Sequence, residues 1–103
     1  MSSTIVHQPR VVWDAARAFV RAAGGPRAAE FAHLVRDLLG PDVQEAFTAT
    51  RDHLAAESAR TGGDRGAFDL EAGKWRIRLD ELLRARPELT EPVRELTGRG
   101  FES

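Results

Sequence analysis

Residues 11–23 read VVWDAARAFVRAA, and a Gly-Gly-Pro sequence at residues 24–26 follows them directly. When the segment is drawn as a helix, only Asp14, Arg17 and Arg21 form a polar strip, and apolar side chains cover the rest. A surface helix needs an apolar arc of only about 100° or a little more, and here the arc is far wider. We therefore predict a helix that is surrounded by the rest of its own domain or by another chain.

Two amphipathic segments follow this helix. Residues 26–39 place their apolar side chains on one face and are ended by Gly40 and Pro41, a pattern typical of a helix with a glycine just after its last turn. Residues 42–60 carry a narrower apolar stripe, which predicts a helix at the periphery. The glycine-rich sequence at residues 61–66 is the clearest predicted loop in the chain.

The C-terminal half leaves two questions open. Residues 68–79 alternate apolar and polar side chains as a hairpin does, yet they also fit helical spacing. We favour a helix, because a lone hairpin without a third strand is only marginally stable. A last helix is expected between Pro87 and Gly98. Pro92 requires either a kink or a later start with Thr90 as the cap.

These elements predict an all-α fold, a small bundle of four to five helices. The 103 residues are enough for one domain. We expect a single helical domain over residues 10–98, with flexible tails at residues 1–9 and 99–103. The N-terminal sequence lacks the pattern of a signal peptide, and no apolar run approaches the roughly 18 residues of a membrane span. A cytoplasmic location without membrane contact is therefore expected.

Composition and motifs argue against catalysis. The chain contains no cysteine, and its net charge is −1, so thiolate chemistry is excluded and no global attraction to nucleic acid or anionic membrane is expected. His33 and His53 each have a carboxylate four residues later, at Asp37 and Glu57, but helix surfaces commonly carry such pairs. We expect no enzyme activity, no cofactor and no bound metal.

The pattern instead favours a non-catalytic protein–protein interaction or adaptor module that binds a protein partner or, through the helix at residues 11–23, a second copy of itself. The first helix carries a stripe of small apolar residues beside its larger ones, and small side chains let a neighbouring helix approach closely. Leu70 and Ile77 would form a second apolar patch behind the core face of their helix. The predicted partner-binding residues are Val11, Asp14, Ala15, Arg17, Ala18, Arg21, Ala22, Leu70 and Ile77.

The alternative is a small DNA-binding regulator or antitoxin. Residues 28–59 have the outline of a helix-turn-helix motif. Asp42 and Glu45 would then lie near the phosphates, and the domain is not basic overall, which makes this alternative the weaker one. The residues that would face the DNA are Gln44, Thr48 and Arg51.

The C-terminal sequence WRIRLDELLRARPEL at residues 75–89, continuing to Leu96, resembles the C-terminal ends of small Ala/Arg-rich helical proteins of high-GC bacteria. Some of these proteins are thought to act as adaptor or effector-associated modules in bacterial conflict and signalling systems. The resemblance implies a non-catalytic role that brings partners together, as death-like domains do. Gly73 and Pro92 depart from the usual pattern, and no functional residue is transferred from it.

Overall fold

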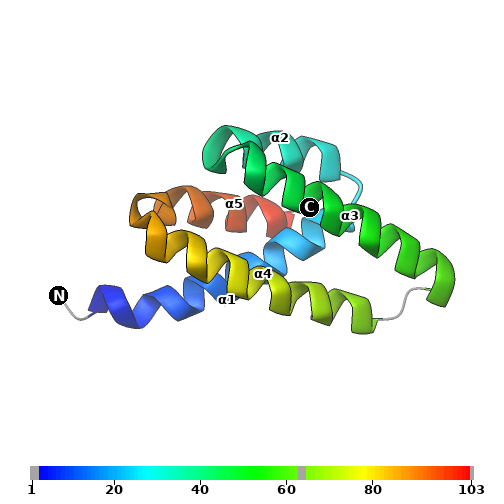
Figure 1. Cartoon of the computed structure of the whole chain (residues 1–103), viewed down its shortest axis with the longest axis horizontal. Coiled ribbons are helices and arrows are strands. Elements are labelled where there is room, and N and C mark those ends of the chain that lie inside the picture. The colour runs from blue at the N-terminus through cyan, green and yellow to red at the C-terminus, as the bar shows by residue number, and fades with distance from the viewer. Residues whose placement is uncertain (1–2, 63–64, 103) are drawn as a thin grey trace.

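Helices account for almost all of residues 3–62 and 65–102, the part of the chain that the computed structural model describes (Figure 1). The described residues form no strand, so the all-α prediction is confirmed, and the ambiguous stretch at residues 68–79 is helical. The elements are α1 (Ser3–Ala23), α2 (Ala28–Leu39), α3 (Pro41–Thr61), α4 (Arg65–Ala85), the 3-10 turn η1 (Pro87–Leu89) and α5 (Thr90–Glu102).

The predicted helix end at Gly40 is confirmed, whereas the predicted loop at residues 61–66 is shorter than expected, because α3 runs to Thr61 and α4 begins at Arg65. Gly40 and Gly62 both adopt backbone angles that other residues rarely take. Gly40 has a φ of 106° and is the single residue between α2 and α3. Gly62 has a φ of 76° and closes α3 in the left-handed conformation, with its N–H donating to the carbonyl of Ser58. Since one residue joins α2 to α3, the two helices fold back on each other and pack side by side (Figure 1).

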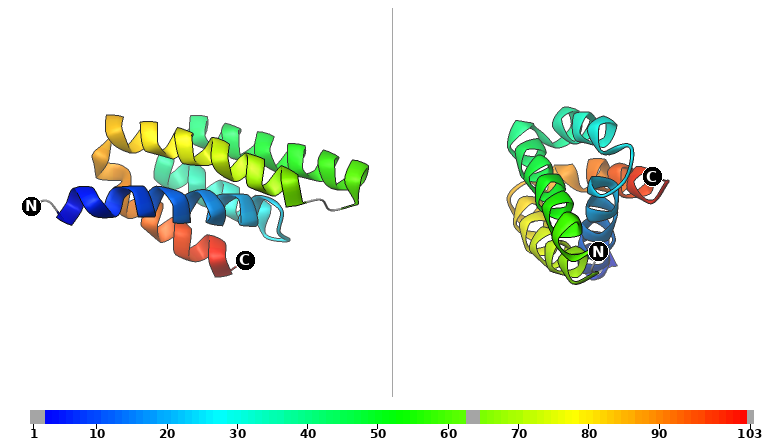
Figure 2. Two further views of the ribbon diagram at one scale, coloured as in Figure 1. Left: turned by 90° about the horizontal axis from the view of Figure 1, so that it is seen from below. Right: turned by 90° about the vertical axis from the view of Figure 1, so that its right-hand side faces the viewer.

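Helix α1 lies inside the bundle and contacts all four other helices. The predicted wrapping of this helix is therefore provided by its own chain. Figure 2 shows α1 between α5 and the layer formed by α3 and α4, and it shows that α3 and α4 continue past the C-terminal end of α1.

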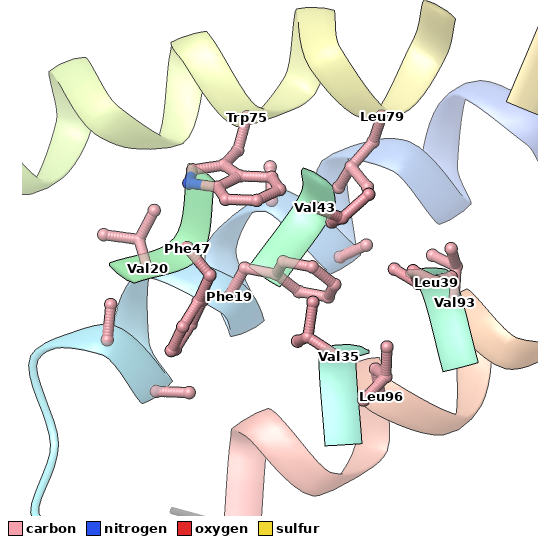
Figure 3. Close-up of a cluster of buried hydrophobic side chains, with 14 of the residues drawn as sticks. Phe19, Val20, Val35, Leu39, Val43, Phe47, Trp75, Leu79, Val93 and Leu96 are labelled. Atoms are coloured by element: carbon pink, nitrogen blue, oxygen red, sulfur yellow. The ribbon is translucent and has the colours of Figure 1, made fainter. Parts of the chain in front are cut away.

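Phe19 is the centre of an aromatic cluster that joins four helices (Figure 3). Its ring centroid lies 5.3 Å from that of Phe31 on α2, 6.4 Å from Phe47 on α3 and 5.0 Å from Trp75 on α4. All four side chains are buried. Aromatic pairs at these separations add roughly 0.5–1.5 kcal/mol each beyond the area they bury, so this cluster holds α1 in register with α2, α3 and α4.

The predicted tails are largely helical, which corrects the expected helix limits. Helix α1 begins at Ser3 and includes Pro9, whose fixed φ is compatible with a helix. The tail prediction had placed the helix boundary at this proline. Helix α5 passes through Gly98, its predicted end, and runs to Glu102. The rest of the predicted tails, residues 1, 2 and 103, lies outside the described residues.

Gly100 explains why α5 extends so far. A Cβ atom added to Gly100 would lie 2.7 Å from the carbonyl oxygen of Ala18 and 2.8 Å from its Cβ. The backbones of α1 and α5 therefore meet at this point, which only two very small residues permit. The contact buries the end of α5 and stabilises it as helix, although glycine there has a low helix propensity.

The two possibilities for Pro92 are resolved in favour of the later start. The 3-10 turn η1 ends at Leu89 and α5 begins at Thr90, so Pro92 lies in the first helical turn, where its missing N–H removes no intrahelical bond. Thr90 does not cap α5 as predicted, since its hydroxyl donates to the carbonyl of Pro87. In the same turn, a backbone hydrogen bond and the Arg86 side chain lower the pKa of the Glu88 carboxyl.

The close approach of α1 and α5 predicts opposite effects for two glycine substitutions in α5. Gly100→Ala should lower the free energy of unfolding by about 1–2 kcal/mol, because the added methyl forces the helices apart. Gly98→Ala is the matched control, because a Cβ there meets no atom within 4 Å. It should raise the free energy of unfolding by up to about 1 kcal/mol through helix propensity. Urea denaturation followed by circular dichroism measures both, and equal stabilisation by the two variants would contradict the contact.

Candidate interaction surface

The small-residue stripe of α1 faces the interior of the protein. Ala15, Ala18 and Ala22 have exposed fractions of 0%, and Val11 is half-buried. This burial corrects the prediction that the stripe meets a partner, because the chain has enough helices to cover it. The small side chains admit α5 and not a second protein, as the contact between Ala18 and Gly100 demonstrates.

The polar strip of α1 lies at the surface, beside an exposed tryptophan. Arg17 and Arg21 are exposed and Asp14 is half-buried. The Trp13 side chain is 41% exposed. The guanidinium carbon of Arg17 lies 5.4 Å from the Trp13 ring centroid, and that of Arg76, on α4, lies 5.1 Å from it. These cation–π contacts fix the orientation of the ring at the seam between α1 and α4.

Leu70 and Ile77 are exposed on the outside of α4, as predicted. Their exposed fractions are 56% and 53%, although both are large apolar residues. They are seven positions apart in the sequence, so they lie about two turns apart on the same face. Gly73 lies between them on this face, and a Cβ added there would meet no atom within 4 Å. Together these three residues form what we call the α4 outer face.

The helix-turn-helix outline corresponds to the pair α2 and α3. Thr48 and Arg51 on α3 are exposed and Gln44 is half-buried. Asp42 and Glu45 are also exposed on this helix. The described surface of α3 therefore presents carboxylates together with Arg51, not a continuous basic strip of the kind that contacts phosphates.

A buried hydrogen bond between α3 and α4 escaped the sequence analysis. The indole Nε1 of Trp75 donates to Oγ1 of Thr50 over 2.8 Å, and this hydroxyl donates to the carbonyl of Ala46 over 3.1 Å. Thr50 can therefore lie in the apolar stripe of α3, because its hydroxyl accepts the hydrogen bond of the buried indole N–H. The two residues are 25 positions apart, so no local pattern could have revealed the pair.

The same helix pair contains a buried carboxylate. Glu71 is buried, and its Oε2 lies 2.8 Å from Nδ1 of His53 and 3.1 Å from Nζ of Lys74. The sequence had paired His53 with Glu57, but Glu57 instead binds Arg60 at 2.7 Å. His53 and Lys74 both bind the Glu71 carboxylate, and the His53–Glu71 contact links α3 to α4.

Other classes of site have little support. Among the described residues, no group of three or more His, Asp or Glu side chains could hold a metal ion. No helix in the described part of the chain is both long and apolar enough to cross a membrane. Comparison with protein families, with curated proteins and with solved structures found no match to this chain.

The Trp75–Thr50 bond predicts that Thr50→Val is destabilising although the two side chains have nearly the same shape. The substitution leaves the buried indole N–H without an acceptor, which should lower the free energy of unfolding by about 1–3 kcal/mol. Thr48→Val, at an exposed position of the same helix, should change it by less than about 0.5 kcal/mol. Urea denaturation of both variants measures the difference. Equal stability of the two would mean that the hydrogen bond does not contribute.

Proposed function

We propose that the protein is a non-catalytic protein–protein interaction module that associates with a second copy of itself through the α4 outer face. The observation that carries this proposal is the exposure of Leu70 and Ile77 on one face of α4. Neighbouring exposed apolar side chains are a common mark of an interaction site. A domain of 103 residues also buries a limited share of its surface on folding, so association would add useful stability.

The arrangement of the α4 outer face suits a symmetric contact. In a two-fold interface, a residue of one copy meets a given residue of the other, and the reverse contact also occurs. Gly73 lies near the midpoint between Leu70 and Ile77. If two α4 helices cross antiparallel at Gly73, Leu70 of each copy packs against Ile77 of the other. The missing side chain at Gly73 lets the helices approach closely at the axis.

The Trp13 site would border this contact. Arg76, which lies over the Trp13 ring, immediately precedes Ile77 in α4. Aromatic residues and arginine are enriched in protein interfaces. The rim of the proposed contact at the α1–α4 seam is therefore polar and aromatic, formed by Arg17, Arg76 and Trp13.

This role agrees with what the resemblance of the C-terminal stretch to bacterial adaptor modules implies. A cytoplasmic location is part of the proposal, on the basis of the sequence alone. We do not favour the DNA-binding alternative, because the exposed Asp42 and Glu45 would face the phosphates. Association with a protein does not require the basic surface that DNA binding needs.

Sedimentation over a protein concentration series tests the proposal. The wild type should pass from the monomer mass of 11.4 kDa toward twice that mass as its concentration rises. Ile77→Glu should weaken association at least tenfold, a loss of about 1.4 kcal/mol, because it places a charge in the apolar contact. Its circular dichroism spectrum should not change, since Ile77 is exposed.

The control is Phe101→Glu, which removes an exposed apolar side chain from α5, and it should associate as the wild type does. A wild type that stays monomeric at every concentration would refute self-association. If Phe101→Glu weakened self-association as much as Ile77→Glu does, the contact would not lie at the α4 outer face.

A further inference from the structure

An open groove of about 740 Å³ lies where α3 and α4 continue past the end of α1. The C-terminal end of α1, the first residue of α2, the second half of α3 and the first turn of α4 line it. Because α1 stops at Ala23 while its neighbours continue (Figure 2), the inner sides of α3 and α4 lack a covering helix here. The groove is distinct from the α4 outer face, and the inference below does not depend on self-association.

The described residues that line this groove carry charges of one sign, and we call it the arginine groove. Arg21 of α1, Arg51 of α3 and Arg65 of α4 line it, and the other described lining residues are uncharged. All three arginines are exposed, and they form no ion pair within residues 3–62 and 65–102. Elsewhere on the surface, Arg60 and Arg84 pair with nearby carboxylates. Three guanidinium groups from three helices, without an ion pair to any described residue, therefore line one groove in a chain whose net charge is −1.

The floor of the arginine groove is apolar. Leu54 and Phe68 are half-buried and line it together with alanines and glycines. A Cβ added to Gly24 would lie 3.9 Å from Cδ1 of Leu54, so the end of α1 adjoins the leucine. Covering these side chains with an apolar group would remove them from water, which is favourable.

The arginine side chains at the groove suit an anionic head group. The N–H groups of Gly24 and Gly25 already donate to the carbonyls of Val20 and Ala22, so this glycine turn offers no free N–H group to a ligand. The planar fork of a guanidinium group matches the oxygens of a carboxylate or a phosphate.

We propose that the arginine groove binds a small amphipathic anion, with its apolar body on Leu54 and Phe68 and its head group held by the arginines. The volume of about 740 Å³ lies within the range of roughly 300–1,000 Å³ that is usual for small-molecule sites. A second copy of this chain is a poor occupant, because two facing grooves would bring like charges together. The smaller cavity of about 240 Å³ offers no such field, since Asp14 lines it beside Arg10 and Arg94.

Titration of the protein with decanoate, followed by ¹⁵N NMR, tests this proposal. Decanoate should cause saturable shifts that are confined to the groove, at Gly24, Gly25, Ala55 and Ala67. Decyltrimethylammonium, which has the same chain and the opposite charge, should cause none. No saturable shift with decanoate, shifts outside the groove, or equal binding of the cation would each overturn the proposal.

Matched variants assign the binding to the arginines. The double variant Arg51→Gln/Arg65→Gln should weaken decanoate binding at least tenfold and stay folded, because both side chains are exposed. Arg36→Gln, at an exposed position outside the groove, should bind as the wild type does. Unchanged binding by the double variant would overturn the role of the arginines.

Two further probes distinguish other occupants. Decyl phosphate should cause saturable shifts at the same residues as decanoate, and shifts that lie outside the groove would overturn the proposal. A glutamate-rich amphipathic helical peptide is the third probe. If it occupies the groove while decanoate does not, the site belongs to a protein segment and the small-ligand proposal is wrong.

Discussion

The burial of the apolar arc of α1 is the constraint on which the rest of the structure depends. A helix with so wide an apolar arc must be covered on nearly all sides, and four other helices of this small chain contact it. Phe19 fills the space between α1, α2, α3 and α4, while Ala18 leaves room for α5 at Gly100. One helix thus presents a large side chain toward one set of neighbours and small ones toward another. The packing is therefore specific in register, and it accounts for the extension of α5 to Glu102.

This use of α1 determines which surfaces remain for function. Once its small-residue stripe is inside the protein, the large apolar residues that remain more than half exposed in the described chain are Leu70 and Ile77 on α4. The α4 helix can carry them because its other side is held firmly, through Trp75 bonded to Thr50 and through the buried Glu71. At the far end, α1 is too short to cover α3 and α4, which leaves the arginine groove. The arginine groove thus follows from where α1 ends, and the α4 outer face follows from which side of α4 the bundle leaves exposed.

The sequence could predict the helices but not their mutual arrangement. Apolar spacing, Gly40 and the glycine-rich sequence at residues 61–66 indicated the fold class and the approximate helix boundaries, because these are local signals. The tail at residues 99–103 was wrong because glycine in a helix is read locally as a stop, whereas Gly100 is required by a contact with Ala18 82 positions away in the chain. The exposure of Leu70 and Ile77 followed from periodicity. The burial of the α1 stripe, the partner of His53 and the convergence of Arg21, Arg51 and Arg65 depend on tertiary packing, which periodicity does not encode.

The central claim is that α1 is internal to the monomer and that the α4 outer face meets a second copy. The most direct measurement is a dilution series of ¹⁵N NMR spectra of the wild type. The account predicts concentration-dependent shifts at Leu70, Gly73 and Ile77, and none at Ala15, Ala18 or Ala22. Shifts that instead concentrate on the α1 alanines would mean that the copies exchange or share α1, and would contradict the account.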